Sequence, residues 1–269
     1  MMIGRDMPHV AVTRATKPGP VRLRLKNLNQ PRATRFGTSL TDINMVLRAG
    51  QIIGISGISG NGQQELAAVI SGEVRASAAD MVHIKDQPVG HMGPMQRRRL
   101  GFAFVPEERL GRGAIPEMSL ADNSLLTAHR RGMLRHGFVR RRVEKAFTGR
   151  CIDEFDVRTP GPNAEAGAMS GGNLQKFILG REIMLDPDLM LVSQPTWGVD
   201  IGAATAIRRR LIDMRNSGKA ILVISEDVEE LFEICDILHV LCKGQLSAGL
   251  TAAETSAEDI GAYMIGSQI

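Results

Sequence analysis

The segment GISGISGNGQQEL, Gly54 to Leu66, places a glycine-rich turn between an apolar run and a run typical of a helix. The apolar residues QIIGIS predict a buried strand that leads into this turn, and QQELAAVI predicts the first turns of the helix that follows. Gly57, Gly60 and Gly62 allow backbone N–H groups to turn inward and surround an anion, and the helix adds the positive end of its dipole. The segment therefore has the shape of a phosphate-binding loop.

One part of that loop is missing. The full pattern G-x-x-x-x-G-K-[ST] adds a Lys for the outer phosphates and a hydroxyl for Mg²⁺, and this chain has Gln63 and Gln64 at those positions. Glutamine can donate a hydrogen bond to phosphate but brings no charge. Taken alone, the segment fits a structural glycine turn as well as it fits a nucleotide site.

Composition sets the outer bounds. A chain of 269 residues can bury a large core, as one domain or as a domain with an inserted lobe. It is 43% apolar with a formal net charge of +4, and no basic strip interleaved with aromatic residues makes nucleic acid the leading partner. Cys151, Cys235 and Cys242 lack metal-ligand spacing, which indicates buried or free thiols in a reducing compartment.

Membrane and secretion signals are not evident in the sequence. No apolar run approaches the ~20 residues of a membrane helix, and the first twenty residues are too charged and too interrupted by Pro for a secretory signal. Any link to a membrane is therefore expected to run through another subunit. The densest basic run, HRRGMLRHGFVRRR from His129 to Arg142, fits either a solvated helical face and loop or a surface that meets a partner.

Strand and helix patterns alternate along the chain. Strands are expected at residues 21–28, 43–56, 81–89, 100–106, 188–193, 219–225 and 236–246, and helical patterns at 119–155, 170–185, 201–218 and 226–235. Strands that are apolar throughout, separated by helices, indicate an α/β fold with a largely parallel sheet, joined by an antiparallel β portion and an inserted helical lobe.

A second glycine motif gives the first its context. MSGGNLQK, Met169 to Lys176, places Ser170, Gly171, Gly172 and Asn173 at the start of a helix, where a hydroxyl and free N–H groups favour an anion. About ten residues later, DPDLMLVSQPTWGVD (186–200) reads as a buried strand and its loop. The order of these segments resembles the nucleotide-binding domains of ABC transporters: phosphate loop, signature sequence, Walker B strand, D-loop and switch region.

The resemblance covers about residues 21–250 of this P-loop NTPase-like fold. SGGNLQK, QPTWGVD, VPEER and ISEDVEEL look like the second domain of the double-domain ATPase subunits of simple-sugar and nucleoside importers, a domain that commonly departs from the consensus. It implies a linker or tail of a preceding repeat at 1–20, a core at 21–107 and 187–250, a helical signature lobe at 108–186, and a C-terminal helix and tail at 251–269. MMIGRD at the start also echoes YMIGSQ near the end (263–268), so we expect the chain to begin where an earlier copy of the domain ends.

The same resemblance shows at which positions this chain differs from the consensus of the family. Glu107 stands at the Q-loop position, Ser193 where an Asp would help to hold Mg²⁺, Gln194 at the catalytic carboxylate and Glu226 at the switch histidine, whereas Asp200 of the D-loop and the signature are kept. The candidate site residues are therefore, for the loop, Gly57, Ser59, Gly60, Asn61, Gly62, Gln63 and Gln64; for the rest of its own site, Glu107, Ser193, Gln194 and Glu226; and for the partner's site, Ser170, Gly171, Gly172, Asn173 and Asp200. No catalytic residue and no metal ligand is expected.

These differences predict an asymmetric domain, in which the chain's own nucleotide site is defective and its signature is competent to complete the site of a partner. Phosphoryl transfer depends on Lys and Mg²⁺ to neutralise charge and on a group that orients water, and each is absent. In this family two domains hold two nucleotides head to tail, and each signature closes over the partner's nucleotide, so the signature here would serve a partner.

The resemblance implies weak or interface-bound Mg-ATP, a second nucleotide-binding domain, permease subunits that dock near 107–133, indirectly a solute-binding protein, and a place on the cytoplasmic face of the cell membrane. A pseudo-ATPase scaffold that binds no nucleotide is the alternative. An active ATPase with substitute residues is a third interpretation, which Gln63, Ser193, Gln194 and Glu226 disfavour.

Overall fold

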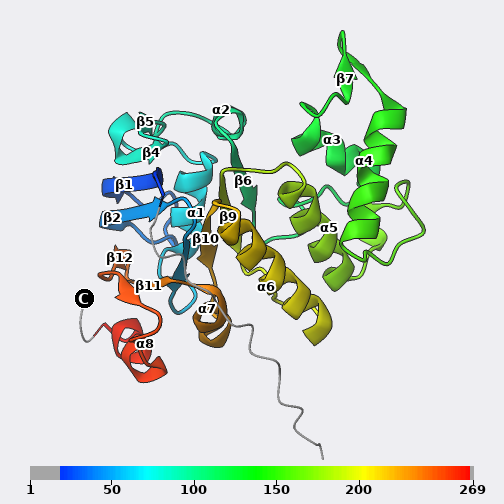
Figure 1. The fold of residues 1–269 in the computed structure, drawn as a ribbon. Coiled ribbons are helices and arrows are strands. Elements are labelled where there is room, and N and C mark those ends of the chain that lie inside the picture. Colours follow the sequence, from blue (N-terminus) through cyan, green and yellow to red (C-terminus); the bar gives the residue numbers. More distant parts are fainter. Residues whose placement is uncertain (1–18, 267–269) are drawn as a thin grey trace, which may run out of the picture.

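The computed structural model describes residues 19–266, which form two sheets, a central layer of helices and a lobe of helices to one side (Figure 1). The N-terminal part of the echo between MMIGRD and YMIGSQ lies outside the described residues, as do residues 267 and 268. The predicted α/β class with parallel and antiparallel portions is confirmed.

The main sheet is built around five parallel strands. Its order is β12-β11-β3-β10-β9-β6, with β13 paired to β11, and β11, β3, β10, β9 and β6 run parallel to their neighbours. The bounds are β3 Ile52–Ser56, β6 Phe102–Val105, β9 Leu189–Ser193, β10 Ala220–Ile224, β11 Ile237–Cys242, β12 Gln245–Leu246 and β13 Leu250–Thr251. Every residue of β3, β9 and β10 is buried, as strands covered on both faces require.

The second sheet is antiparallel and has the order β2-β1-β4-β5. Its strands are β1 Val21–Gln30, β2 Leu40–Arg48, β4 Val82–Ile84 and β5 Gln87–Pro88. Helix α1 (Gln63–Ser71) lies between the two sheets, because Leu66, Val69 and Ile70 pack in one apolar cluster with residues of both. The other face of the main sheet is covered by α6 (Ile201–Asn216) and α7 (Val228–Ile234).

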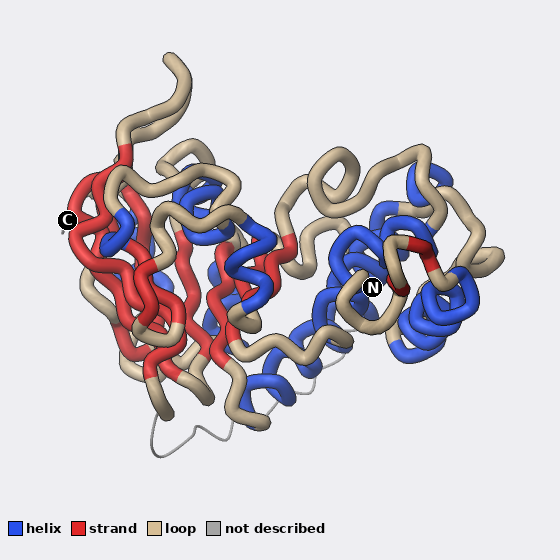
Figure 2. The backbone as a smooth tube through the Cα atoms, turned by 90° about the horizontal axis from the view of Figure 1, so that it is seen from above, coloured by secondary structure: helices blue, strands red, loops and turns tan. Residues whose placement is uncertain are grey.

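The lobe contains α3 (Leu120–Ala128), α4 (Arg141–Glu154) and α5 (Gly171–Ile183), with a small hairpin of β7 (Leu134–Arg135) and β8 (Phe138–Val139). Seen from above, these helices group to one side of the strands of both sheets (Figure 2). Helix α2 (Pro94–Arg99) lies beside β6, and α8 (Ala257–Met264) packs on β11 at the C-terminal side.

Three expectations from the sequence are corrected. The strand expected at 43–56 is two strands, β2 and β3, which belong to different sheets. The single strand expected at 81–89 is a hairpin, because Lys85 and Asp86 both adopt positive φ, at 52° and 62°, and turn the chain back. The helical pattern expected over 119–155 is interrupted at 134–139 by the β7–β8 hairpin, where His136 and Gly137 have φ of 49° and 84°. Neither conformation fits a helix.

A buried ionic cluster fastens the lobe to the sheet. Arg98 of α2 donates to Glu182 Oε2 at 2.6 Å, and Arg181 Nε donates to Glu182 Oε1 at 2.9 Å. Arg181 also donates to the carbonyl oxygens of Asn123 and Gly113, at 3.1 and 2.9 Å. Burial acts to raise the pKa of Glu182, but the charges of Arg98 and Arg181 outweigh it, so the pKa lies below its ordinary value.

Replacing Glu182 with Gln keeps the volume and leaves the buried Arg181 and the partly buried Arg98 without their anion, so we expect a loss of about 3 kcal/mol in the free energy of unfolding at pH 7. Because the folded-state pKa is depressed, this stabilisation is present above the ordinary pKa of 4.5 and is lost as the pH falls below it. Urea unfolding between pH 7 and pH 4 should therefore show the gap between wild type and variant narrowing toward acid pH. Asp156→Asn, which removes an exposed pair with Lys176, is the control, with an expected loss below about 1 kcal/mol; equal losses would contradict the assignment.

Candidate functional site

The phosphate loop leaves β3 and enters α1 through glycines that have no substitute. A Cβ at Gly57 would lie 2.4 Å from the carbonyl oxygen of Leu241, so the loop can cross β11 only without a side chain there. Gly62 caps α1 with φ of 112°, a conformation that favours glycine. The backbone shape of a phosphate loop is therefore present.

The side chain of Gln63 lies across this loop. Its Oε1 accepts from the backbone N–H of Asn61 at 3.1 Å, and its Nε2 donates to the carbonyl oxygen of Ile58 at 3.0 Å. Asn61 in turn accepts at Oδ1 from the backbone N–H of Lys243 at 2.7 Å. The N–H of Asn61 also reaches the carbonyl oxygen of Ile58 at 3.3 Å, so this N–H group is satisfied within the loop and is not offered to an anion.

Next to the loop is a hollow of about 180 Å³ that gathers most of the residues predicted for the chain's own site. Those that line it are Ser59, Gly60, Gly62, Gln63, Gln64, Glu107, Ser193, Gln194 and Glu226. Gly57 and Asn61 belong to the same loop but do not line the hollow. Seven further lining residues were missed from the sequence, namely Phe36, Glu65, Ala67, Phe104, Arg112, Ile224 and Ser225.

The charge of this hollow has the wrong sign for a polyphosphate. Glu107 and Glu226 line it without a counter-ion among the described residues, whereas Arg112, the cationic side chain in its lining, is paired with Glu73 on the far side. Glu65 accepts from the backbone N–H of Thr38 at 2.9 Å. The residues present do not fit a magnesium-bound triphosphate, because neither the Lys charge nor a carboxylate at position 193 is there.

Gln194 joins the end of β9 to the switch loop. It adopts φ of 51°, and its backbone N–H donates to Ile224 at 2.7 Å. Its side-chain Oε1 accepts from the backbone N–H of Glu226 at 3.3 Å and from Ser225 Oγ at 3.4 Å. The amide thus holds the switch loop in place and cannot act as a general base at neutral pH.

The signature residues lie in a different hollow, of about 650 Å³, which shares no lining residue with the first. Ser170, Gly172, Asn173 and Asp200 line it, at the N-termini of α5 and α6. Asn173 Nδ2 donates to Ser170 Oγ at 2.8 Å. The backbone N–H of Ala203 donates to Asp200 at 2.9 Å and lowers the pKa of that carboxyl.

Arg109 connects the Q-loop segment with the signature helix and the D-loop, a role not foreseen from the sequence. Its Nε donates to Gln175 Oε1 at 3.1 Å, its Nη2 donates to the carbonyl oxygen of Trp197, and its guanidinium lies 5.8 Å from the Trp197 ring centroid. A Cβ at Gly171 would lie 2.7 Å from Arg109 Nη1, so the signature glycine leaves room for this side chain. Gln175 extends the connection to the carbonyl oxygen of Pro195 at 3.1 Å.

Signals for the missed residues were present but weak. Phe36 is one of few aromatic residues in a chain in which they are 4% of the total. The structure adds that its ring is 96% exposed beside the hollow, where it is suited to stacking on a planar group. Arg109 is the last residue of VPEER, a motif recognised without a role for its arginine. The hydrogen bonds of Arg109 with Gln175 and Trp197 join segments that lie far apart in the chain, and sequence periodicity does not reveal such contacts.

The described residues contain no helix long and apolar enough to cross a membrane. Over the same residues, 19–266, no group of three or more His, Cys, Asp or Glu side chains is arranged to hold a metal ion. The sheet order, the glycine loop between β3 and α1, and the lateral helical lobe together define a P-loop nucleotide-binding cassette.

Comparison with known proteins identifies the family. The family model described as ABC transporter matches residues 40–197, more than half of the chain, so the chain belongs to the ABC transporter ATP-binding family. Similar curated proteins include the nucleoside import ATP-binding protein NupA of Lactococcus lactis, 35% identical over 100% of this chain and 53% of NupA. The guanosine import ATP-binding protein NupO of Bacillus subtilis is 32% identical over 99% and 52%, and the ribose import ATP-binding protein RbsA of Clostridium tetani is 31% identical over 98% and 51%.

The chain thus spans about half the length of the curated relatives it matches. Among solved structures, an ATP-binding subunit of an ABC transporter matches with a TM-score of 0.73 at 20% identity, covering 91% of this chain and 99% of that one. A dimeric ATP-binding cassette with ADP and phosphate matches with a TM-score of 0.73 at 18% identity, covering 86% and 98%. These likenesses confirm the cassette fold.

Trp197 is the one tryptophan of the chain and so reports on the Arg109 contacts. Arg109→Met removes both hydrogen bonds and the cation over the ring, and we expect lower fluorescence anisotropy, stronger acrylamide quenching and a loss of about 1 kcal/mol in stability. Arg112→Met is the matched control, because Arg112 contacts Phe104 and Glu73 and no part of the D-loop. Unchanged Trp197 emission in Arg109→Met would refute the bracing role.

Proposed function

We propose that the chain is an ATP-binding domain of an ABC-type importer for a nucleoside or simple sugar, with a degenerate nucleotide site of its own and a signature that completes the site of a partner domain. One observation carries the proposal. The altered residues gather in one hollow, and the retained signature residues gather in another. The solute class follows from the nucleoside, guanosine and ribose importers to which the chain is similar.

The own site lacks the means to hold and cleave a triphosphate. Gln63 occupies part of its loop, Glu107 and Glu226 add negative charge, and Gln194 is not a base. Losing one electrostatic contributor of this kind typically costs about 3 kcal/mol of transition-state stabilisation. Several losses together leave no useful hydrolysis, so any nucleotide bound here would be held weakly.

The signature side retains the features that a neighbouring nucleotide would need. Ser170 and the two glycines after it begin α5, whose positive end favours a phosphate group. Arg109 and Gln175 brace this helix start against the D-loop. In the head-to-tail arrangement of the family, this surface would close on the nucleotide held by the second domain.

The surface beside the lobe suggests where a membrane permease would bind. A hollow of about 490 Å³ between α2 and α3, lined by Met95, Leu126, His129 and Arg131, is suited to receive a segment of a membrane permease. Met95 and Leu126 are 58% and 46% exposed and offer the apolar contacts. The chain would then sit at the cytoplasmic face of the membrane, with a solute-binding protein acting through the permease.

We also propose that the chain is divided into a core, a signature lobe and two terminal segments. Residues 21–107 and 187–250 would form the core, 108–186 the signature lobe, 1–20 a linker or tail of a preceding repeat, and 251–269 a C-terminal helix and tail.

The second candidate function is a scaffold that binds no nucleotide. The Gln63 hydrogen bonds across the loop favour it, because they remain satisfied only without a phosphate in the loop.

Restoring the missing groups separates these two candidates. Gln63→Lys with Gln64→Ser should tighten ATP binding to the isolated chain by about 10- to 100-fold, as hydrogen bonds to charged groups contribute about 1.5–3 kcal/mol. Gln87→Lys, which adds the same charge on the exposed β5, should not. Binding measured by calorimetry with ATP is the readout; no saturable binding by either the wild type or the restored variant supports the scaffold, and strong hydrolysis by the wild type alone overturns both.

Ser170 tests the contribution to a partner. When the chain is mixed with a consensus ATP-binding domain of one of these importers, we expect it to stimulate that domain's ATP hydrolysis, and Ser170→Arg to abolish the stimulation. Ser217→Arg, at the exposed far end of α6, should leave it intact. Equal stimulation by wild type and Ser170→Arg would contradict the role of the signature.

A further inference from the structure

The β7–β8 hairpin is the one basic motif of the sequence that the proposed function leaves without a role. Leu134 pairs with Val139 and Arg135 with Phe138, and His136 and Gly137, both at positive φ, close a two-residue turn. Such a turn matches the twist of its strands. Figure 1 shows the hairpin projecting from the top of the lobe, beyond the ends of α3 and α4.

The base of the hairpin is anchored, so its tip is held in a defined place. Met133 is fully buried and packs with Ala128 and Phe147 in a small apolar cluster between α3 and α4. The backbone N–H of Arg140 donates to the carbonyl oxygen of Met133 at 2.7 Å and closes the hairpin at its base. The projection is therefore a built feature of the lobe.

Positive charge is concentrated on the hairpin and on the segments that flank its base, with Arg135 in the hairpin itself. No Asp or Glu occurs between Asp122 and Glu144, and six exposed arginines do: Arg130, Arg131, Arg135, Arg140, Arg141 and Arg142. Arg141 is paired with Asp122 and Glu144, at the base. Within residues 19–266, the side chains of Arg130, Arg135 and Arg142 are exposed and have no ion-pair or side-chain hydrogen-bond partner, so their charges are not neutralised by the protein.

The tip also exposes apolar side chains. Phe138 is 79% exposed and Leu134 is 43% exposed. By their places in the two-stranded register they lie on opposite faces of the hairpin. A flat protein surface could cover one face only, whereas entry of the tip into a fluid layer buries both.

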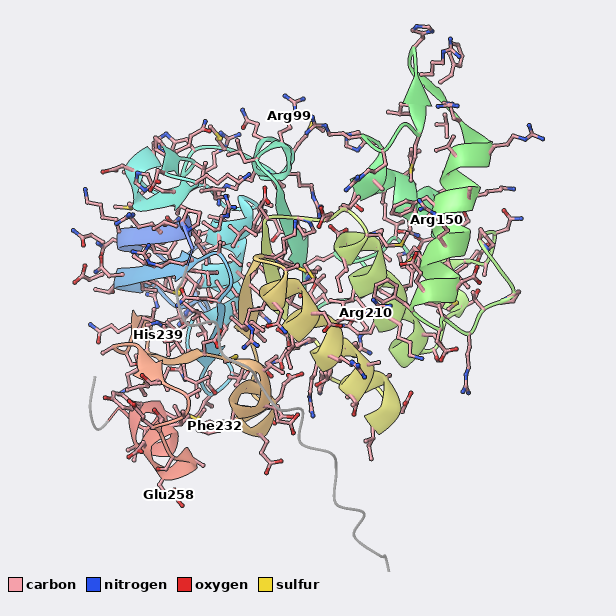
Figure 3. All side chains as sticks on the ribbon, in the orientation of Figure 1. Arg99, Arg150, Arg210, Phe232, His239 and Glu258 are labelled. Atoms are coloured by element: carbon pink, nitrogen blue, oxygen red, sulfur yellow. The ribbon has the colours of Figure 1, made fainter. Side chains whose placement is uncertain are left out.

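We propose that the β7–β8 hairpin binds the surface of a bilayer of anionic phospholipids, with Arg135 and the arginines that flank the hairpin on the headgroups and Phe138 and Leu134 in the interfacial layer. Basic side chains around an exposed apolar tip have the chemistry that such a surface recognises. The base of the hairpin borders the hollow between α2 and α3, and Figure 3 places Arg99 at the same upper edge of the molecule. The inference that this edge faces a membrane rests on the proposed function. The positive charge and the exposed hairpin are independent of that function.

Vesicle flotation with the full chain tests the proposal. The probes are vesicles of phosphatidylglycerol and phosphatidylethanolamine, vesicles of phosphatidylcholine, and soluble polyglutamate. We expect binding to the anionic vesicles that weakens as salt rises. Arg135→Glu with Arg142→Glu should reduce it by roughly 30-fold or more, since each basic residue contributes about fivefold, and Phe138→Ser by about tenfold.

The matched control is Lys26→Glu with Arg209→Glu, on the exposed surfaces of β1 and α6. Each reversal changes the formal charge by two units, so both double variants lower the net charge of +4 to zero. Vesicle binding kept in this control and lost in the hairpin variant supports the proposal. Equal loss in both, equal binding to neutral vesicles, no vesicle binding, unchanged binding by Phe138→Ser, or arginine-dependent binding to polyglutamate alone overturns it.

Failure here is distinguishable from failure of the proposed function. The hairpin residues touch neither the signature nor the phosphate loop, so the hairpin variant should stimulate a soluble partner domain as the wild type does. Loss of stimulation in Ser170→Arg together with no lipid binding by the wild type would retain the proposed function and reject the lipid surface alone.

Discussion

The arrangement of the two candidate sites depends on the buried ion pairs of Glu182 with Arg98 and Arg181. Charges taken out of water are tolerated only when they are fully paired, and removing one partner is costly. Because Arg98 belongs to α2 and Glu182 to α5, this pairing sets where the lobe stands against the sheet. The start of α5, with the signature, is thereby fixed relative to the loop between β3 and α1.

Backbone shape and charge have been separated in the phosphate loop. Gly57 and Gly62 are required by close approach and by φ, whether or not an anion is bound, so the fold itself preserves them. Gln63 and Glu226 are under no such constraint: the Gln63 side chain donates to Ile58, and Glu226 donates to Gln194 only through its backbone N–H. The form of this loop therefore does not depend on the charge of its side chains.

The sequence predicted the strands of the parallel sheet well, because burial on both faces makes them apolar throughout. The residues of the loop and of the signature were named from their motifs, and most of them line two hollows, whereas Gly57, Asn61 and Gly171 line neither. Sequence prediction failed where the backbone turns at positive φ on residues other than glycine, as at Lys85 and His136. It also failed for Arg109, since a bond from 109 to 175 and 197 depends on packing between distant segments.

Two buried cysteines, Cys151 in the lobe and Cys235 beside the main sheet, can each report on local opening of the structure around them. Burial raises the pKa of Cys151 in the lobe to about 12, and burial also raises that of Cys235 beside the sheet. Both sulfurs are thus protonated and shielded at neutral pH, and an alkylating reagent reaches either one only when its surroundings open. The modification rates of these two thiols measure, without any added label, how often the lobe and the sheet core each loosen.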